Sequence, residues 1–194
     1  NLEKFDISLI SESSAGKDKL WKQLGVENGF AKIVKFTIRL CLKNNFSFVF
    51  VKKRESKDLS KKEMTWYQKF LNKDEFEFLS KNSTIVQKKD FISYKAIHQS
   101  KVSIGTCSTL LREKLALKGK ILACNFTPLE HYDFPIKGIC FLKNPTFEEF
   151  EQRFLEILEI DKDDYFSRIN NKQLIRVDEN NTQFYDLNKN IQSL

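Results

Sequence analysis

The turn from Gly105 to Thr109 is the segment whose residue types most clearly allow chemistry. An apolar run ends at Gly105, small hydroxyl residues follow, and a helix is predicted to begin near Ser108. The first backbone N–H groups of a helix lack partners within it and carry partial positive charge, so this turn suits a phosphate group. Gly105, Thr106, Ser108 and Thr109 are the candidate phosphate-binding residues. The alternative is ordinary helix capping by Ser108.

Glu113 lies four residues after Thr109, so the two side chains share one face of the predicted helix. A carboxylate one turn beyond the helix start could accept hydrogen bonds from the hydroxyl groups of a ribose or a sugar. The alternative is a solvated surface charge.

A basic cluster, Lys52-Lys53-Arg54, directly follows the most regular predicted strand, residues 46–51. The Arg54 guanidinium can donate to two phosphate oxygens, and Lys52 can add a point charge. In a parallel sheet this loop and the Gly105 turn lie at the same edge, and we expect them to be neighbours. We interpret Lys53 as a solvated charge at the strand end.

Two further segments carry secondary candidates. The loop 11–17 contains Ser13 and Ser14, whose hydroxyls could touch a diphosphate, although we favour a plain connecting loop. Its Ala-Gly-Lys run is not a nucleoside triphosphatase P-loop, because the first glycine and the final Ser or Thr of that motif are absent. His131 lies in a polar loop and has the near-neutral pKa of a general base, but we favour a plain loop residue there as well. No catalytic residue is assigned.

The elements that must position these residues are predicted from hydrophobic periodicity. Most predicted strands are continuous apolar runs, which is typical of parallel strands covered on both faces. We expect an open, doubly wound, Rossmann-like α/β sheet of about five or six strands in residues 1–170, with a tail, residues 171–194, packing back on it. The predicted strands are 6–10, 46–51, 84–86, 102–105 and 121–124. The predicted helices are 30–42, 62–71, 94–98, 108–118 and 161–169, and Gly119 is expected to end the helix 108–118. A further helix is expected to begin at the capping box that Thr146 forms with Glu149.

Composition narrows the partners. The 194 residues carry 33 Lys and Arg against 26 Asp and Glu, a net charge of +7. This surplus favours nucleotide phosphates, nucleic acid or an acidic membrane surface, unless the charges are merely solvated. The basic residues are not interleaved with exposed aromatic residues, so nucleic acid is disfavoured.

Cysteine and histidine usage bears on metals and location. The four cysteines are far apart and there are two histidines, so no zinc-binding spacing exists and we expect no metal. No run approaches the roughly 18 apolar residues of a membrane span. We expect reduced, mostly buried thiols in a cytoplasmic protein, with the inner face of the cytoplasmic membrane as a further candidate location.

The stretch from Ser100 to Lys120 resembles the carboxy-terminal half of GT-B glycosyltransferases, most closely those of bacterial lipopolysaccharide, O-antigen and capsule biosynthesis. The shared pattern is a strand, a Gly/Ser/Thr-rich turn, and a helix with Glu-Ala-Leu-Ala followed by Gly-Lys. Here the helix reads Glu-Lys-Leu-Ala, with Lys114 in place of the usual small residue. The resemblance extends loosely from about Asp6 to Leu187. It includes the segments 134–142 and 178–182.

The resemblance implies a domain that binds a nucleotide-sugar donor through Arg54, the Gly105 turn and Glu113, with Glu113 contacting ribose or sugar hydroxyls. Positive groups at the site would stabilise the departing diphosphate without a metal. An amino-terminal acceptor domain, absent from this chain, would supply the base, so the chain alone should bind donor weakly and turn over poorly or not at all.

Two alternatives stay open. One is a nucleotide-sugar 2-epimerase of the same architecture, disfavoured because Lys52-Lys53-Arg54 stands where His-Pro-Arg is expected. The other is a non-catalytic domain whose basic face binds nucleic acid or anionic lipid.

Overall fold

The computed structural model describes residues 4–12, 18–52, 57–83 and 92–170. The predicted strand at 84–86 and the predicted tail at 171–194 lie outside the described residues, as does the segment 178–182.

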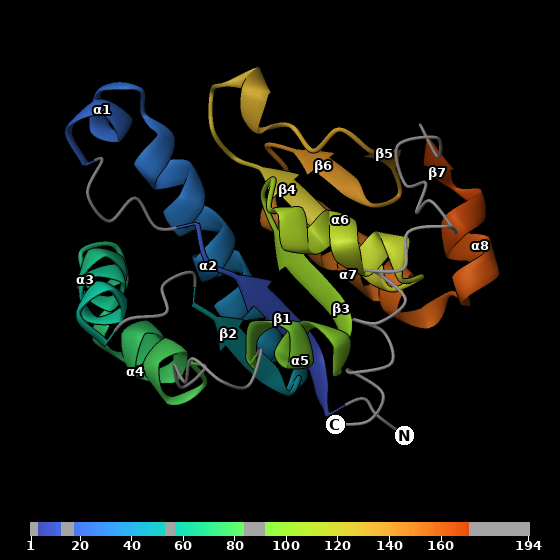
Figure 1. Ribbon diagram of the computed structural model, residues 1–194, viewed down its shortest axis with the longest axis horizontal. Helices are drawn as coiled ribbons and strands as arrows, with labels where there is room; N and C mark the ends of the chain where they lie inside the picture. The colour runs from blue at the N-terminus through green and yellow to red at the C-terminus, as the bar shows by residue number, and fades with distance from the viewer. Residues whose placement is uncertain (1–3, 13–17, 53–56, 84–91, 171–194) are drawn as a thin grey trace, which may run out of the picture.

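Five parallel strands form the central sheet, in the order β2-β1-β3-β4-β6 (Figure 1). This confirms the prediction of an open, mainly parallel α/β sheet of the Rossmann-like type. A separate antiparallel pair joins β5 to β7. The strands are β1 (Phe5–Ile10), β2 (Phe48–Val51), β3 (Ser100–Gly105), β4 (Lys120–Asn125), β5 (Lys137–Gly138), β6 (Phe141–Lys143) and β7 (Ile169–Asn170).

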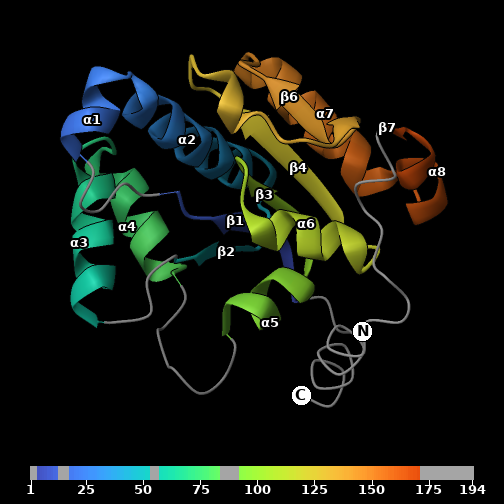
Figure 2. The same ribbon diagram turned by 45° about the horizontal axis from the view of Figure 1, so that its top comes forward.

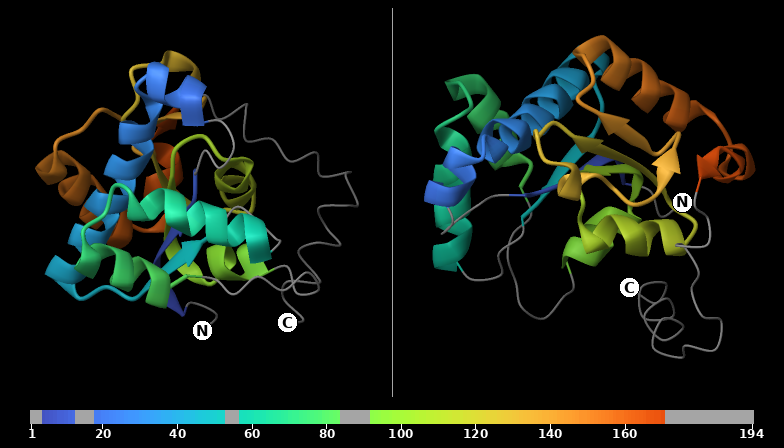
Figure 3. Two further views of the ribbon diagram at one scale, coloured as in Figure 1. Left: turned by 90° about the vertical axis from the view of Figure 1, so that its left-hand side faces the viewer. Right: turned by 90° about the horizontal axis from the view of Figure 1, so that it is seen from above.

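Helices cover both faces of the sheet. Figure 2 shows α1 and the start of α2 on the same side as the loop after β4, and α3 and α4 beside β2. Seen from above, α2 and α7 lie on one face, and α5 and α6 lie on the other (Figure 3). The helices are α1 (Asp18–Gln23), α2 (Val26–Asn44), α3 (Lys57–Gln68), α4 (Lys73–Lys81), α5 (Ile92–His98), α6 (Thr109–Ala116), the 3-10 helix η1 (Glu130–Tyr132), α7 (Phe147–Glu159) and α8 (Lys162–Ser167).

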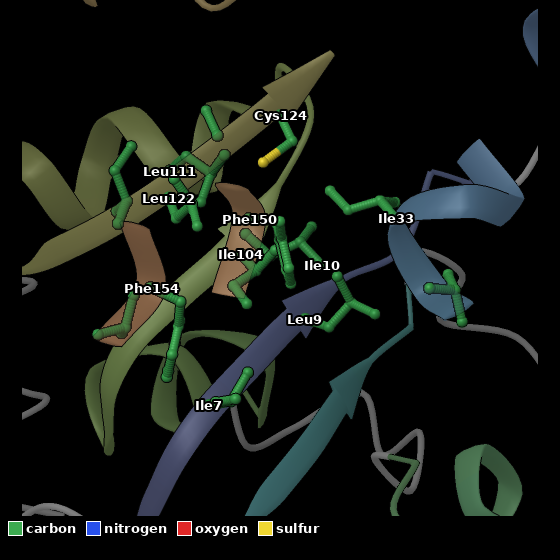
Figure 4. Close-up of a cluster of buried hydrophobic side chains, with 14 of the residues drawn as sticks. Ile7, Leu9, Ile10, Ile33, Ile104, Leu111, Leu122, Cys124, Phe150 and Phe154 are labelled. Atoms are coloured by element: carbon green, nitrogen blue, oxygen red, sulfur yellow. The ribbon is translucent and has the colours of Figure 1, made fainter. Parts of the chain in front are cut away.

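The core lies between the sheet and its helices. Leu9 and Ile104 are in register on adjacent strands, and Phe150 and Phe154 of α7 approach this face of the sheet (Figure 4). All four side chains are fully buried. Burying each such side chain contributes roughly 1.5–3 kcal/mol, so this layer holds α7 on the sheet.

Helix ends explain several boundaries. The predicted capping box is confirmed, since Thr146 and Glu149 each accept from the other's backbone N–H. The predicted role of Gly119 in ending α6 is wrong, because the residue in the left-handed conformation is Lys118, with a φ of 59°. Gly119 is needed for space instead: a Cβ there would lie 2.5 Å from Lys114 Cγ.

A close approach also fixes the start of α2. A Cβ on Gly29 would lie 2.8 Å from the backbone nitrogen of Thr127, in the loop after β4. The glycine therefore lets the helix pack directly on the backbone of that loop.

The strand order decides which loops are neighbours. The chain passes from β1 outward to β2 and then returns to add β3 on the other side of β1. The loops after β1 and β3 therefore flank the point where the strand order reverses, which is where open parallel sheets bind ligands. The expectation that Lys52 adjoins the Gly105 turn is wrong by one strand, because β1 lies between β2 and β3. Lys53 and Arg54 lie outside the described residues.

Candidate functional site

The turn after β3 gathers the predicted phosphate-binding residues at the start of α6. Gly105 is buried, and a Cβ there would lie 3.1 Å from Leu111 Cδ1. The Ser108 hydroxyl accepts the Leu110 N–H at 3.3 Å, so the capping interpretation holds for Ser108. Thr106 is buried and Thr109 is exposed. The positive end of α6, with Thr109 on its surface, thus lies at the point of strand reversal.

Lys52 lies half-buried at the end of β2, near the fully buried Glu63 of α3. Burial lowers the pKa of the Lys52 ammonium, and the Glu63 carboxylate opposes that effect. An ammonium that already faces a carboxylate offers less net positive charge to a phosphate. The role of Lys52 as a phosphate ligand therefore stays a prediction, with Glu63 offsetting part of its charge.

Lys53, Arg54, Ser13 and Ser14 lie outside the described residues, so their roles stay predictions.

The side chain of Glu113, on α6, lies beside α5. It is half-buried, so it is not the fully solvated charge of the alternative interpretation. The Tyr94 hydroxyl of α5 is a neighbour of its carboxylate. Burial raises the pKa of Glu113, and the nearby Tyr94 hydroxyl partly offsets that rise. The carboxylate therefore lies beside Tyr94 and has one buried oxygen, Oε2, that accepts no hydrogen bond from the described residues.

The two lysines that follow Glu113 serve the scaffold. Lys114, 3 % exposed, donates to the carbonyl oxygens of Ile97 at 2.9 Å and Ser100 at 2.6 Å, where α5 ends and β3 begins. Lys120 donates to carbonyls at the end of α7, those of Ile157, Leu158 and Ile160. Both ammonium groups thus satisfy carbonyls at helix C-termini. Lys114 therefore has a structural role in this fold.

Glu12 was not among the residues predicted from the sequence. It lies two positions after Ile10, the last residue of β1. Its side chain is buried, 8 % exposed, beside the strand reversal. The Tyr67 hydroxyl, from α3, accepts the Glu12 N–H at 3.1 Å and shares a 2.9 Å hydrogen bond with Ser11 Oγ. The sequence does show an acidic residue two positions beyond a central strand, but the serines that follow it were selected as candidates instead.

The loop after β4 brings an aromatic side chain to the same region. Tyr132 packs against Phe30, with ring centroids 5.2 Å apart, and Trp21 packs against both rings. Burial raises the pKa of Tyr132, and the nearby Cys107 and Glu12 raise it further. Tyr132 therefore lies close to both loops that flank the strand reversal.

His131 is exposed on this loop, and its ring lies 4.0 Å from that of Tyr132. No hydrogen bond or ion pair of His131 is seen among the described residues, so its part as a general base stays a prediction.

The described residues contain no cluster of three or more His, Cys, Asp or Glu side chains suited to a metal ion. None of the helices in the described ranges is long and apolar enough to cross a membrane. Cys41, Cys124 and Cys140 are buried and Cys107 is half-buried, as predicted for free thiols.

Comparisons with protein-family models, with curated proteins and with solved structures found no match to this chain. The fold defines an α/β domain of the Rossmann-like type with a polar site at the strand reversal, and its activity must be argued from that site.

Proposed function

We propose that this chain is the nucleotide-sugar donor-binding domain of a GT-B-type glycosyltransferase acting in bacterial surface-polysaccharide biosynthesis. One observation supports the proposal: α6 starts at the strand reversal and, one turn later, carries Glu113, whose Oε2 atom is buried and accepts no hydrogen bond among the described residues. A nucleotide sugar needs both features, since it combines a diphosphate with a ribose and a sugar rich in hydroxyls.

Each group has a defined part in this proposal. The N-terminus of α6 and the exposed Thr109 hydroxyl bind diphosphate oxygens, and Glu113 accepts hydrogen bonds from hydroxyl groups. Arg54 adds the guanidinium that completes charge neutralisation. Lys52 contributes at longer range, because β1 separates its strand from the Gly105 turn.

Transfer breaks the bond between the anomeric carbon of the sugar and a diphosphate oxygen, and the electron pair leaves with the diphosphate. An acceptor hydroxyl forms the new bond and gives its proton to a base, which we assign to the acceptor-binding part of the enzyme. The positive end of α6 and Arg54 stabilise the negative charge that develops on the diphosphate. The donor domain alone therefore binds donor but does not complete transfer.

The test is a thermal-shift and calorimetric panel of UDP, CDP, GDP and their sugars, together with CMP-linked acids, on the 194-residue chain. One nucleotide class should stabilise the fold selectively, by about 2.7 kcal/mol at a concentration one hundred times its Kd. Arg54→Ala and Glu113→Ala should each abolish the shift.

Matched controls are Arg112→Ala, an exposed arginine on α6, and Glu159→Ala, an exposed glutamate at the end of α7. Both should keep the wild-type shift. Binding of arbitrary DNA with steep salt dependence, and no selective nucleotide shift, would support the non-catalytic alternative and overturn this proposal.

A further inference from the structure

The solvent-facing side of α2 carries all four cations of that helix. At about 100° of rotation per residue, its outward side chains fall within an arc of about 100°. The acidic residue of this helix, Glu27, lies outside that arc and accepts a hydrogen bond from Trp66 Nε1 at 3.2 Å. The outward face is formed by Asn28, Lys32, Lys35, Arg39, Leu42 and Lys43.

Aromatic rings hold two of these cations in place without neutralising them. Lys32 Nζ lies 5.0 Å from the centre of the Phe126 ring, and Arg39 Cζ lies 3.8 Å from the centre of the Phe147 ring. A ring face attracts a cation but carries no net charge, so the positive charge still acts on a further partner. The exposed face of α2 is therefore both basic and ordered.

The solvent-facing side of α7 has the opposite charge. The basic residue of this helix, Arg153, lies to one side and donates to the carbonyl oxygen of Ile139 at 3.2 Å. The outward face, found from the same rotation per residue, is formed by Glu148, Glu149, Gln152, Leu155, Glu156 and Glu159.

Two of these glutamates are already used within the chain. Glu149 closes the capping box at the start of α7, and Glu156 pairs with Arg168 at 2.7 Å. Among the described contacts, Glu148 and Glu159 remain for a partner, and both are exposed. They lie near the two ends of the helix, so they frame the acidic face.

The basic and acidic rows match in length. Lys32 and Lys43 are eleven residues apart, and so are Glu148 and Glu159, which corresponds to about 16.5 Å along an α-helix. Within one copy the two helices also attract each other where they meet, since Lys43 Nζ lies 2.6 Å from Glu151 Oε2. The same pairing chemistry is available to their outward faces.

The position of both helices on one face of the sheet selects the partner (Figure 3). A flat anionic surface that approached α2, such as a membrane or a nucleic-acid duplex, would also meet the glutamates of α7 and be repelled by them. A second copy of the chain offers an acidic α7 to the basic α2 and a basic α2 to the acidic α7. A two-fold axis satisfies both contacts and closes the assembly at two copies.

We propose that the outward faces of α2 and α7 form the interface of a homodimer, in which the cations of α2 pair with the glutamates of α7 in the second copy. Charge complementarity between exposed groups provides specificity and fast association more than strength, so the dimer is weak and salt-sensitive. The interface also covers Leu42, which is 61 % exposed. Because α6 lies on the other face of the sheet, the contact does not depend on the proposed nucleotide site (Figure 3).

Sedimentation velocity of the 194-residue chain measures the association directly. The wild type should form dimers at low salt. Raising the salt from about 50 mM to about 500 mM should weaken the dimer by about tenfold or more, because exposed ion pairs are screened. A wild type that stays monomeric in the low-salt buffer, at protein concentrations up to about 200 μM, overturns the proposal.

Charge-reversal variants identify the surface. Lys35→Glu/Arg39→Glu places acidic groups on the α2 face, and Glu148→Lys/Glu159→Lys places basic groups on the α7 face. Each variant alone should dimerise at least about tenfold more weakly than the wild type, because like charges then meet in both contacts. Mixed in equal amounts, the two variants should form a heterodimer, in which one contact is native and the other joins two reversed faces.

The control variant is Lys61→Glu/Lys62→Glu, which makes the same change in charge at exposed positions of α3 and should dimerise like the wild type. If both charge-reversal variants also dimerise like the wild type, the dimer uses another surface and the proposal is overturned. Should Arg39→Glu unfold the chain, the single changes Lys35→Glu and Glu159→Lys provide the second measurement, and their mixture should again restore association. A monomeric wild type that binds phosphatidylglycerol vesicles through Lys35 would replace the dimer with a membrane contact and overturn the proposal as well.

Discussion

The two ends of the sheet's parallel strands differ in the sign of the charged side chains that pack there. At the edge where the strands begin, Lys114 and Lys120 donate to carbonyls at the ends of α5 and α7. At the edge where the strands end, Glu12 and Glu63 are the buried charged side chains. Helices that connect parallel strands run against them, so their negative C-terminal ends collect at the first edge and their positive N-terminal ends at the second.

The contacts of these lysines affect what the net charge of +7 implies about binding partners. Two of the lysines that produce it are committed to carbonyl groups inside the fold, and a third, Lys52, faces a buried carboxylate. The basic surplus is therefore weaker evidence for a broad anionic partner than composition suggests. The proposed site at the start of α6 depends on a local arrangement and needs no broadly basic surface.

The largest effect is expected from Lys114→Met, which keeps the apolar stem and removes the ammonium. Two buried carbonyl oxygens, those of Ile97 and Ser100, would lose their charged donor, and the free energy of unfolding should fall by about 3 kcal/mol. Chemical denaturation measures the change. The control, Lys162→Met at an exposed position on α8, should stay within about 0.5 kcal/mol. A loss below 1 kcal/mol for Lys114→Met would contradict the structural role of this lysine.

At the opposite edge, Tyr67→Phe should lower the free energy of unfolding by about 1–2 kcal/mol. The Glu12 N–H and Ser11 Oγ would both lose the phenol oxygen while remaining buried. Thr65→Ala, an exposed change on the same helix, is the control and should have little effect. Hydrogen exchange should show the Glu12 amide losing protection in Tyr67→Phe; unchanged protection would mean that the phenol does not hold this loop.

The smallest expected effects are on the pH dependence of the free energy of unfolding, and they have opposite signs for Asp6 and Glu113. Burial alone would raise the pKa of Asp6, but hydrogen bonds from Lys101 and Ser47 outweigh it and hold that pKa below its ordinary value. The stability that Asp6 provides is complete above its unfolded pKa of about 3.9 and is lost as the pH falls through the folded pKa. Asp6→Asn should therefore lower stability by up to about 1 kcal/mol at pH 7 and less in acid.

Glu113 should behave in the opposite way, because its pKa is raised in the folded state. Ionised Glu113 costs stability at neutral pH, and that cost disappears as the pH falls through the raised pKa. Glu113→Gln should thus be slightly more stable than the wild type at pH 7, by no more than about 0.5 kcal/mol. Urea titrations of both variants at pH 7 and pH 3 separate the two cases. If Asp6→Asn and Glu113→Gln changed the free energy of unfolding at pH 7 in the same direction, the opposite pKa shifts of these two carboxyl groups would be refuted.

Much of the fold was predictable because its signals are local. Apolar runs identify the strands, and the Thr146–Glu149 capping box and Ser108 mark helix starts by direct side-chain bonds. The Gly105 turn was found for the same reason, since glycine, hydroxyl residues and helix follow one another within five positions.

The missed features all depend on contacts between distant parts of the chain. A single lysine in an amphipathic helix is normally solvated, and only the return of α5 beside α6 buries Lys114. Glu12 is buried because Tyr67, 55 residues later, covers the loop after β1. The order β2-β1-β3 also has no local signal, which is why Lys52 was placed one strand too close to the Gly105 turn.

The contact of Gly29 with the backbone at Thr127 has a consequence for biosynthesis. The start of α2 rests on a loop that leaves the ribosome much later, so the amino-terminal third of the chain cannot finish folding while it is being made. Until then Phe30 lacks its neighbour Tyr132 and offers an apolar surface to chaperones. A nascent chain stalled before residue 126 should be bound by them, and one released after residue 170 should not.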